Sequence, residues 1–287
     1  MRLSIDTIGG SRSGLQLEDV VFKAAVYGVI LALVLLIVIP LLVVVSVAFT
    51  PTSELFSNPS AWFPQNPTLQ WWSVGFAELQ EGLLHSLVIS VGTALIALVI
   101  TIPGAYVFGR KEFVGKQFVF YAIILSLLFP SIVLVVPITA RWLQWGLYDS
   151  YIGLWIAFQI FITPFAIWIL RDYFSKLPEN LEEAAQVYGC TEFGAFVRVI
   201  LPIAKPALIA VGFLAFLNGW NEFLFANLLT TSSGVQPAIV QLYATLHSGQ
   251  GESIPWSMLM AQALIIGTPP AILYFVAQKG LRGAFGP

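Results

Sequence analysis

The stretch from Glu182 to Pro202 reads EEAAQVYGCTEFGAFVRVILP, and it is a polar segment between two strongly apolar ones. A connection inside a membrane protein needs only a few residues, whereas this one predicts two short helices joined by a turn. Asn180 is expected to cap the first helix, with Glu183 completing a capping box. Gly189 suits the left-handed turn that ends this helix.

The second short helix also carries start and stop signals. Thr191 is expected to cap it, and Glu192 lies in its first turn, where a negative charge is favourable. Pro202 is expected to end it, because proline lacks the N–H that a helix interior requires. On the first helix, Ala184 and Ala185 form a small apolar knob among charged residues, a shape that fits a partner's groove.

Composition places the whole chain in a membrane. Of its 287 residues 58% are hydrophobic and 10% are charged, and the mean hydropathy is +0.86. Soluble domains carry roughly 25% charged residues. We therefore predict a polytopic membrane protein. A net charge of −2 argues against a nucleic-acid partner, and the single cysteine, Cys190, excludes an internal disulfide.

Apolar runs of spanning length divide the chain into three parts. We predict an N-terminal tail (1–23), a six-span domain (24–278) that contains a 175–204 loop, and a C-terminal tail (279–287). Each run is long enough to cross a hydrocarbon core of ~30 Å as a helix. The predicted fold class is therefore an all-α polytopic membrane protein, with spans at 24–49, 83–108, 118–140, 151–170, 207–229 and 257–277.

The distribution of positive charge predicts the orientation of these spans. Of the 13 Lys and Arg residues, all but Arg141 fall in the two tails and in the 109–117 and 171–205 connections. Short cytoplasmic segments are enriched in Lys and Arg. We therefore expect both termini and the 175–204 loop to face the cytoplasm.

Motifs for chemistry are weak in this chain. The segment from Gly109 to Gln117 resembles a phosphate-binding loop, but its glycines are one residue too far apart and Gln117 replaces the magnesium-binding Ser or Thr. Two histidines and one cysteine provide no spacing typical of a metal site. We therefore expect no enzyme activity, no metal site and no cofactor in this chain, and any use of ATP must come from a partner.

The fifth predicted span holds unusual polar residues. Asn218, Asn221 and Glu222 are spaced to share one face of a helix, and an ionisable residue there is costly in lipid. One interpretation is that they line a pathway and bind the hydroxyl groups of a solute. The other is a hydrogen-bonded cluster between helices, with Gln262 or Thr268 of the sixth span as partner. The sequence does not decide between the two.

The polar stretch resembles the EAA signature of ABC-importer permeases. Glu183-Ala184-Ala185 is followed three residues later by Gly189, and nine further residues lead to Val199-Ile200-Leu201-Pro202. The one departure is Val199, where Ile is usual. The resemblance implies that the 175–204 loop docks on a cytoplasmic ATPase and couples its motion to the spans. The residues it implicates are Glu182, Glu183, Ala184, Ala185, Gly189, Leu201 and Pro202.

Further stretches look like the carbohydrate branch of these permeases, in particular the smaller permease of maltose-type importers. They include Trp220-Asn221-Glu222-Phe223 and the ending from Gln278 to Gly286. The resemblance implies sugar import, a second permease subunit in a heterodimer, and an extracytoplasmic solute-binding protein. It also implies that the protein lies in the plasma (inner) membrane of a prokaryote. It also implies two cytoplasmic ATPase subunits, which would bind the ATP and magnesium.

Three alternatives remain open from the sequence. Permeases for amino acids or polyamines carry the same signature. An ion-coupled secondary carrier could use Glu222 as its coupling carboxylate, although this would leave the Glu182–Pro202 stretch unexplained. The stretch could also be an ordinary amphipathic loop that packs on its own bundle.

Overall fold

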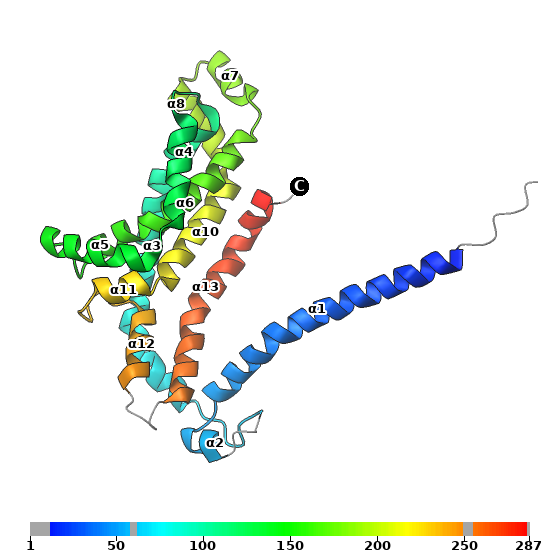
Figure 1. The fold of residues 1–287 in the computed structure, drawn as a ribbon, viewed down its shortest axis with the longest axis vertical. Coiled ribbons are helices and arrows are strands. Elements are labelled where there is room, and N and C mark those ends of the chain that lie inside the picture. Colours follow the sequence, from blue (N-terminus) through cyan, green and yellow to red (C-terminus); the bar gives the residue numbers. More distant parts are fainter. Residues whose placement is uncertain (1–11, 58–61, 249–254, 286–287) are drawn as a thin grey trace, which may run out of the picture.

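A computed structural model describes residues 12–57, 62–248 and 255–285, and these are helices joined by short connections (Figure 1). No strand occurs within these ranges, which confirms the predicted all-helical class. The helices are α1 (Arg12–Ala48), α2 (Thr52–Ser57), α3 (Gln70–Arg110), α4 (Lys116–Leu125), η1 (Ser126–Leu128), α5 (Ser131–Trp145), α6 (Tyr151–Ser175), α7 (Asn180–Val187), α8 (Glu192–Ala195), η2 (Phe196–Ile200), α9 (Leu201–Ile203), α10 (Lys205–Asn221), α11 (Leu224–Leu229), α12 (Ala238–Ser248) and α13 (Trp256–Phe285).

The helices provide up to six membrane spans. Four are long and apolar enough to cross alone, and two bent pairs of helices bring the number to six. Lipid offers no hydrogen-bond partners, so a spanning backbone must satisfy its own polar groups, and a helix does this within one segment. The six apolar runs of the sequence thus correspond to six helical segments, although their shapes differ from the prediction.

The longest bundle helix, α3, is the centre of the fold. Its 41 residues extend for about 60 Å, about twice the thickness of a hydrocarbon core. Residues 70–82, which lie outside the predicted second span (83–108), are therefore part of this helix. It packs against α6, α10, α13 and α12 (Figure 1). Because α3 contacts most of the bundle, a segment bonded to either end of α3 is expected to move together with the core.

Glycines allow the helices around α3 to approach closely. A Cβ on Gly219 of α10 would lie 3.0 Å from the Cα of Ser90 on α3. A Cβ on Gly109 would lie 2.9 Å from the Cβ of Phe174 and 3.0 Å from the carbonyl oxygen of Arg171, both on α6. Small residues at such crossings are typical of helix packing in membranes. Gly109 thereby brings the end of α3 against the end of α6, where the 175–204 loop begins.

The third span is bent, where a single helix over 118–140 was predicted. Lys116–Leu128 and Ser131–Trp145 meet at 97°. The backbone of Phe129 is extended, at φ −72° and ψ 126°. The residue before a proline avoids the helical conformation, so Pro130 breaks the span here. Pro137, by contrast, lies inside α5.

The sixth span is continuous, although its sequence contains the helix-breaking pair Pro269-Pro270. Both prolines lie inside α13. Pro270 cannot donate to the carbonyl oxygen of Ile266, one turn earlier. The indole Nε1 of Trp220 donates to that oxygen instead, at 3.1 Å. A neighbouring helix thus satisfies the acceptor that the proline leaves free, which is the usual way such prolines are tolerated in membranes.

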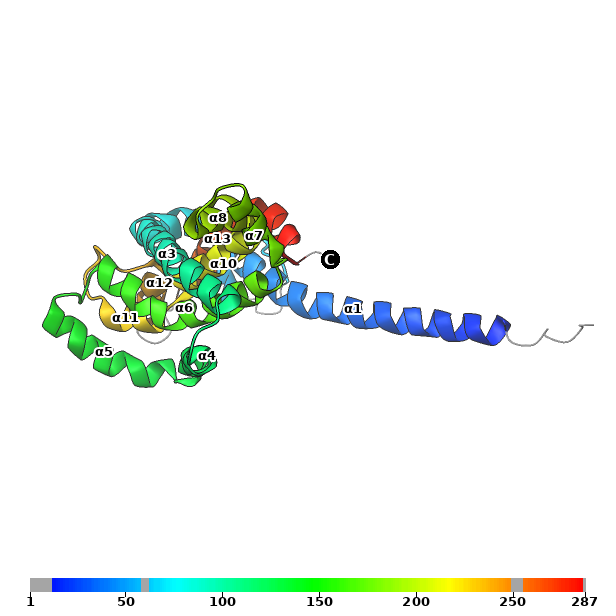
Figure 2. The same ribbon diagram turned by 90° about the horizontal axis from the view of Figure 1, so that it is seen from above.

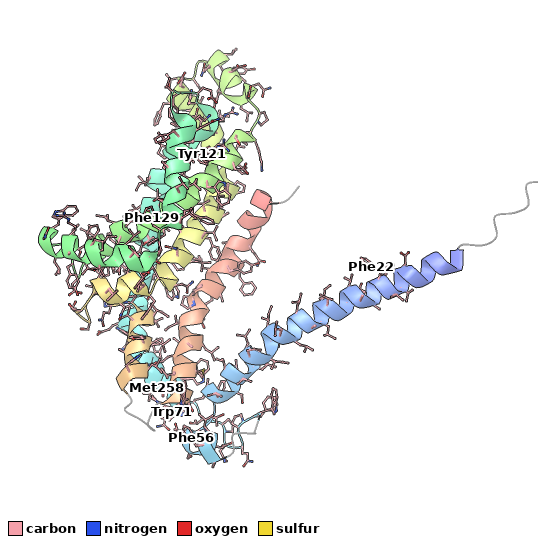
Figure 3. The ribbon with its side chains drawn as sticks, viewed as in Figure 1. Phe22, Phe56, Trp71, Tyr121, Phe129 and Met258 are labelled. Atoms are coloured by element: carbon pink, nitrogen blue, oxygen red, sulfur yellow. The ribbon has the colours of Figure 1, made fainter. Side chains whose placement is uncertain are left out.

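The first span, α1, extends away from the other helices (Figures 1 and 2). None of its most apolar window, within Asp19–Ala48, is buried by the rest of the chain. Figure 3 shows Phe22 far from the bundle. The helix begins at Arg12, so residues 12–23, predicted as a tail, are helical, whereas residues 1–11 lie outside the described ranges. At its C-terminal end α1 contacts α13 (Figure 1).

The carboxylate of Asp149 links the α5–α6 connection to the residues that follow α11. Asp149, between α5 and α6, has φ +55°, and its N–H donates to the carbonyl oxygen of Leu229 at 2.9 Å. Its Oδ1 accepts from the N–H groups of Thr231 and Ser232 at 3.0 and 3.2 Å. Desolvation raises the pKa of this carboxyl, but the hydrogen bonds from Thr231 and Ser232 outweigh it and hold the pKa below its ordinary value.

Candidate functional site

The 175–204 loop lies at one end of the bundle and consists of α7, α8, η2 and α9 (top of Figure 1). Gly189 between α7 and α8 has φ +89°, which confirms the predicted left-handed turn. The Oγ1 of Thr191 accepts from the N–H of Gly194 at 3.0 Å, which confirms the cap of the second helix. Both features limit the motion of the loop within itself.

The predicted cap of the first helix is wrong. Glu179 occupies the capping position, has helical dihedral angles (φ −66°, ψ −32°), and makes no side-chain cap. Asn180 therefore lies inside the first turn of α7, and no capping box forms with Glu183. The reason is that a side-chain cap requires an extended residue before the helix, whereas here the chain is already helical at Glu179.

Pro202 does not end the second helix, contrary to the prediction. The helix widens into a π-helical turn over Phe196–Ile200, where the N–H of Leu201 donates to the carbonyl oxygen of Phe196. This wider turn accommodates Pro202, whose ring would clash with the carbonyl of a regular preceding turn. The bend comes later, at Ala204, where Glu192–Ile203 and Lys205–Asn221 meet at 75°.

Arg110, the last residue of α3, holds the start of the loop. Its Nε donates to Oε1 of Glu182 at 3.2 Å, forming an ion pair in which the two side chains are 5% and 17% exposed. Its Nη1 donates to the carbonyl oxygen of Leu177 at 2.8 Å, and its Nη2 to that of Pro178 at 3.0 Å. A planar guanidinium can make several such bonds at once. We call this set of contacts the Arg110 clasp.

Two weaker contacts complete the attachment of the loop to α3. Lys111 pairs with Glu192 of α8 at 3.2 Å, but both side chains are solvent-exposed, and such pairs contribute little. The ring of Tyr106 packs against Phe196 and Phe174, with ring centroids 4.4 and 6.0 Å apart. The buried aromatic cluster and the clasp together join the loop rigidly to the core.

The exposed surface of the loop includes three large apolar side chains near the Gly189 turn. Val187, Tyr188 and Phe193 are 84%, 89% and 74% exposed, and they lie on both sides of the Gly189 turn. We call these three side chains the tip patch. Of the predicted apolar knob, Ala184 is exposed but Ala185 is buried against the chain itself. Large apolar side chains in a loop outside the spans are typical of a protein-binding surface.

Glu222 lies beyond the helix that was predicted to carry it. Helix α10 ends at Asn221, so Asn218 and Asn221 share this helix and Glu222 does not. The Glu222 carboxylate instead accepts from the N–H groups of Phe225 and Ala226, at 3.0 Å for each closest oxygen. It therefore caps α11, the short helix that completes the fifth span.

The predicted partners of these polar residues bond elsewhere. Nε2 of Gln262 donates to Oε2 of Glu78 at 3.1 Å, and the Thr268 hydroxyl donates to a carbonyl of its own helix. The side chain of Asn221 is exposed, and Oδ1 of Asn218 is buried without a hydrogen-bond partner among the described residues. The cluster between the fifth and sixth spans therefore does not form, and the pathway role stays a prediction.

Sequence reasoning missed the Arg110 clasp and the tip patch. Arg110 was interpreted only as a positive charge that sets orientation. A usable signal was present, because three cations follow the second span and three carboxylates lie at Glu179, Glu182 and Glu183. The described residues hold no group of three His, Cys, Asp or Glu side chains that could bind a metal.

The fold and the loop define a transporter membrane component, and comparison with known families agrees. The pattern of the family of binding-protein-dependent transport system inner membrane components matches residues 101–282. This is more than half of the chain, and the chain belongs to that family.

Curated relatives match over most of this chain. It is 28% identical to the diacetylchitobiose uptake system permease protein NgcG of Streptomyces coelicolor, over 92% of this chain and 87% of the relative. It is 32% identical to the trehalose transport system permease protein SugB of Mycobacterium tuberculosis, over 84% and 88%. It is 31% identical to the sulfoquinovosyl glycerol transport system permease protein SmoH of Agrobacterium fabrum, over 79% of each.

A solved structure shares the fold. A chain in the crystal structure of a bacterial ABC transporter involved in the import of the acidic polysaccharide alginate superposes with a TM-score of 0.79. The match covers 95% of this chain and 99% of the other, at 21% sequence identity. The arrangement of spans and loop described here is thus that of an ABC-importer permease.

Proposed function

We propose that this chain is the sugar-conducting permease subunit of a binding-protein-dependent ABC importer, and that the 175–204 loop couples an ATPase to the spans. The observation that supports the coupling role most directly is the Arg110 clasp. It joins the loop to the end of α3, the helix that contacts most of the bundle. The relatives named for trehalose, diacetylchitobiose and sulfoquinovosyl glycerol uptake support a sugar or sugar derivative as the solute.

In this proposal the loop acts as a rigid lever. The tip patch and Ala184 dock in a groove of the ATPase, burying apolar surface that water now covers. Closure of two ATPase subunits around ATP and magnesium moves the docked loop. The clasp and the Tyr106 cluster join the loop rigidly to α3, so α3 moves when the loop moves. The spans then exchange access between the two sides of the membrane.

The proposal includes further partners and an orientation. A second permease subunit is needed for a closed pathway, and the unburied length of α1 supports the presence of a partner in the membrane. An extracytoplasmic binding protein delivers the solute, and ATP is hydrolysed by the partner ATPases, not by this chain. The Lys and Arg distribution supports cytoplasmic termini. Asn218 and Asn221 of α10 are proposed to line the pathway.

Reconstitution tests this function. The tagged chain is purified from its native membrane, copurifying subunits are identified, and the complex is placed in liposomes with labelled trehalose or chitobiose and a candidate binding protein. Uptake is expected only with internal ATP and should stop when the ATPase subunit carries a substitution in its phosphate loop. Uptake by this chain alone, driven by a proton or sodium gradient, would refute the proposal.

The alternatives are less well supported. Membership of the transport family places the chain among binding-protein-dependent components, which speaks against an ion-coupled secondary carrier. Glu222, the residue that favoured the carrier, is engaged as a helix cap. An amino acid or polyamine as solute is tested in the same liposomes by direct competition with the labelled sugar.

A further inference from the structure

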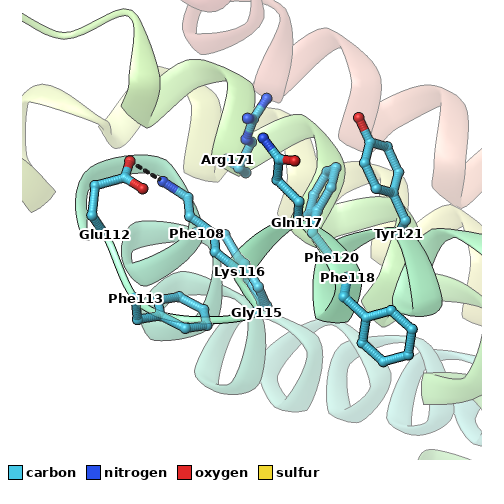
Figure 4. Close-up of a pocket in the computed structure, with 10 residues that line it drawn as sticks. All are labelled: Phe108, Glu112, Phe113, Gly115, Lys116, Gln117, Phe118, Phe120, Tyr121 and Arg171. Atoms are coloured by element: carbon cyan, nitrogen blue, oxygen red, sulfur yellow. Dashed lines mark hydrogen bonds and ion pairs between the residues drawn. The ribbon is translucent and has the colours of Figure 1, made fainter.

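A cavity of about 530 Å³ lies beside the loop end of the bundle, between the end of α3, the start of α4 and α6 (Figure 4). Its lining combines two cations, Lys116 and Arg171, with exposed aromatic rings. It is separate from the 175–204 loop and from the polar residues of α10. Nothing in the coupling mechanism uses it, although its volume is typical of ligand sites.

Arg171 brings an uncompensated positive charge to this cavity. Its Cζ lies 5.0 Å from the centroid of the Phe120 ring, a cation–π contact that holds the guanidinium in place. Within the described part of the chain no carboxylate lies within ion-pair distance of it. Figure 4 shows the side chains of Arg171 and Gln117 pointing toward one another. A guanidinium and an amide are suitable donors for phosphate oxygens.

Lys116 adds a second charge that an incoming anion can recruit. It pairs with Glu112 at 2.7 Å, but the Glu112 side chain is 88% exposed (Figure 4). The Lys116 side chain is 15% exposed, so the pair is only partly in water. The Glu112 carboxylate faces water, which can solvate it when a phosphate takes its place beside Lys116. Lys116 is also the first residue of α4, and a helix N-terminus carries positive potential.

A second, apolar groove of about 680 Å³ lies along α4 and α6, and Phe118 lines both this groove and the cavity. The groove wall includes Ile123, Ile160 and Ile167. Phe118 and Tyr121 at the junction are 79% and 61% exposed. Aromatic rings at this position are typical of the membrane–water interface. A cationic recess at the head of an apolar groove matches a molecule with a phosphate group and an acyl chain.

We propose that this cavity binds the phosphate headgroup of an anionic phospholipid in the leaflet next to the 175–204 loop, with an acyl chain in the adjoining groove. Arg171 and Gln117 hold the phosphate, Lys116 exchanges Glu112 for it, and the groove distinguishes a lipid from free phosphate. The bound lipid fills the space between the 111–115 turn and α6. The inference is independent of which solute the protein carries.

Native mass spectrometry of the full-length chain in detergent tests this site with phosphatidylglycerol as the probe. Arg171→Gln and Lys116→Gln are each expected to weaken binding about fivefold, the effect of about 1 kcal/mol per basic residue at a membrane surface. Arg171→Lys keeps the charge and should retain most of the affinity. Glu112→Gln should tighten binding, because it removes the competing carboxylate.

Controls for net charge come from a second lysine–carboxylate pair, Lys176 and Asp172, which are four residues apart at 2.8 Å, exposed, and outside the cavity lining. Lys176→Gln and Asp172→Asn change the net charge equally and should leave lipid affinity unchanged. Thermal unfolding of each variant reports whether it is folded. Equal effects in both pairs would overturn the proposal, as would displacement of the lipid by millimolar inorganic phosphate. Unchanged lipid affinity in Arg171→Gln and Lys116→Gln would likewise overturn it.

Discussion

Replacing Arg110 with methionine should release the 175–204 loop from α3 while keeping the apolar length of the side chain. The Arg110 side chain is only 5% exposed, and its removal leaves the Glu182 carboxylate without its partner. Breaking a buried ion pair from one side costs about 3–5 kcal/mol. Glu182 is 17% exposed, so water recovers part of this loss, and we expect about 2–3 kcal/mol. This corresponds to about a hundredfold larger population of the detached loop.

Hydrogen exchange of the purified complex measures that population directly. Amides of residues 176–190 should exchange about a hundredfold faster in Arg110→Met, while those of the α3 core stay protected. In liposomes the same variant should hydrolyse ATP with less uptake per ATP. Lys111→Met is the matched control: it loses only the exposed pair with Glu192 and should change both readouts little.

A double-mutant cycle separates the ion pair from the carbonyl contacts. Adding Glu182→Gln to Arg110→Met removes the unpaired carboxylate and should recover part of the lost protection. Exchange rates in Arg110→Met that match those of Lys111→Met would show that the clasp does not hold the loop. Full coupling of ATP hydrolysis to uptake in Arg110→Met would refute its role in the lever.

Three further outcomes are expected. Gly189→Leu forces a side chain into φ +89°, which costs about 1–2 kcal/mol, so uptake should fall while the amount of protein in the membrane stays normal. Gly189→Asn tolerates this conformation and should retain uptake. Equal uptake in the two variants would contradict the role of the turn. Glu222→Ala should lower the stability of the protein by about 1 kcal/mol through loss of the α11 cap. Glu222→Gln keeps a hydrogen-bond acceptor and should lose less stability. An equal loss of stability in both variants would exclude the cap. The pKa of Asp149 is lower in the folded protein than in the unfolded chain, so its hydrogen bonds to Thr231 and Ser232 stabilise the fold above the unfolded pKa of about 3.9. This stabilisation is lost as pH falls through the lower pKa of the folded state. Stability measured against acid pH should show this loss in the original protein but not in Asp149→Asn.

Within the loop, the predictions that depend only on residues close in the chain were correct. A glycine is the residue best suited to a positive φ, so Gly189 was predictable as the left-handed turn. Thr191 was predictable as a cap because its partner, the N–H of Gly194, lies only three residues away in the chain. Asn180 failed because the chain is already helical at Glu179, which the order of residues does not reveal.

The prolines illustrate why span shape needed the tertiary structure. Pro130 bends the third span by 97°, yet Pro269 and Pro270 leave α13 continuous. The difference at Pro270 lies in a neighbour, because the Trp220 indole satisfies the carbonyl that this proline leaves free. Pro202 is likewise accommodated by a π-helical turn before it. Proline predicts a lost hydrogen bond, and only the surroundings decide whether the helix breaks.

The sequence by itself determined the all-helical membrane class and the number of apolar runs. In lipid a spanning segment must satisfy its own backbone hydrogen bonds and must be apolar over the thickness of the hydrocarbon core. It also determined the spacing from Glu183 to Pro202 that marks the loop. Only the tertiary structure decided that Arg110 holds this loop and that Glu222 caps α11. Arg110 and Glu182 are 72 residues apart in the chain, and the fold brings them together where Gly109 permits a close approach of α3 to α6.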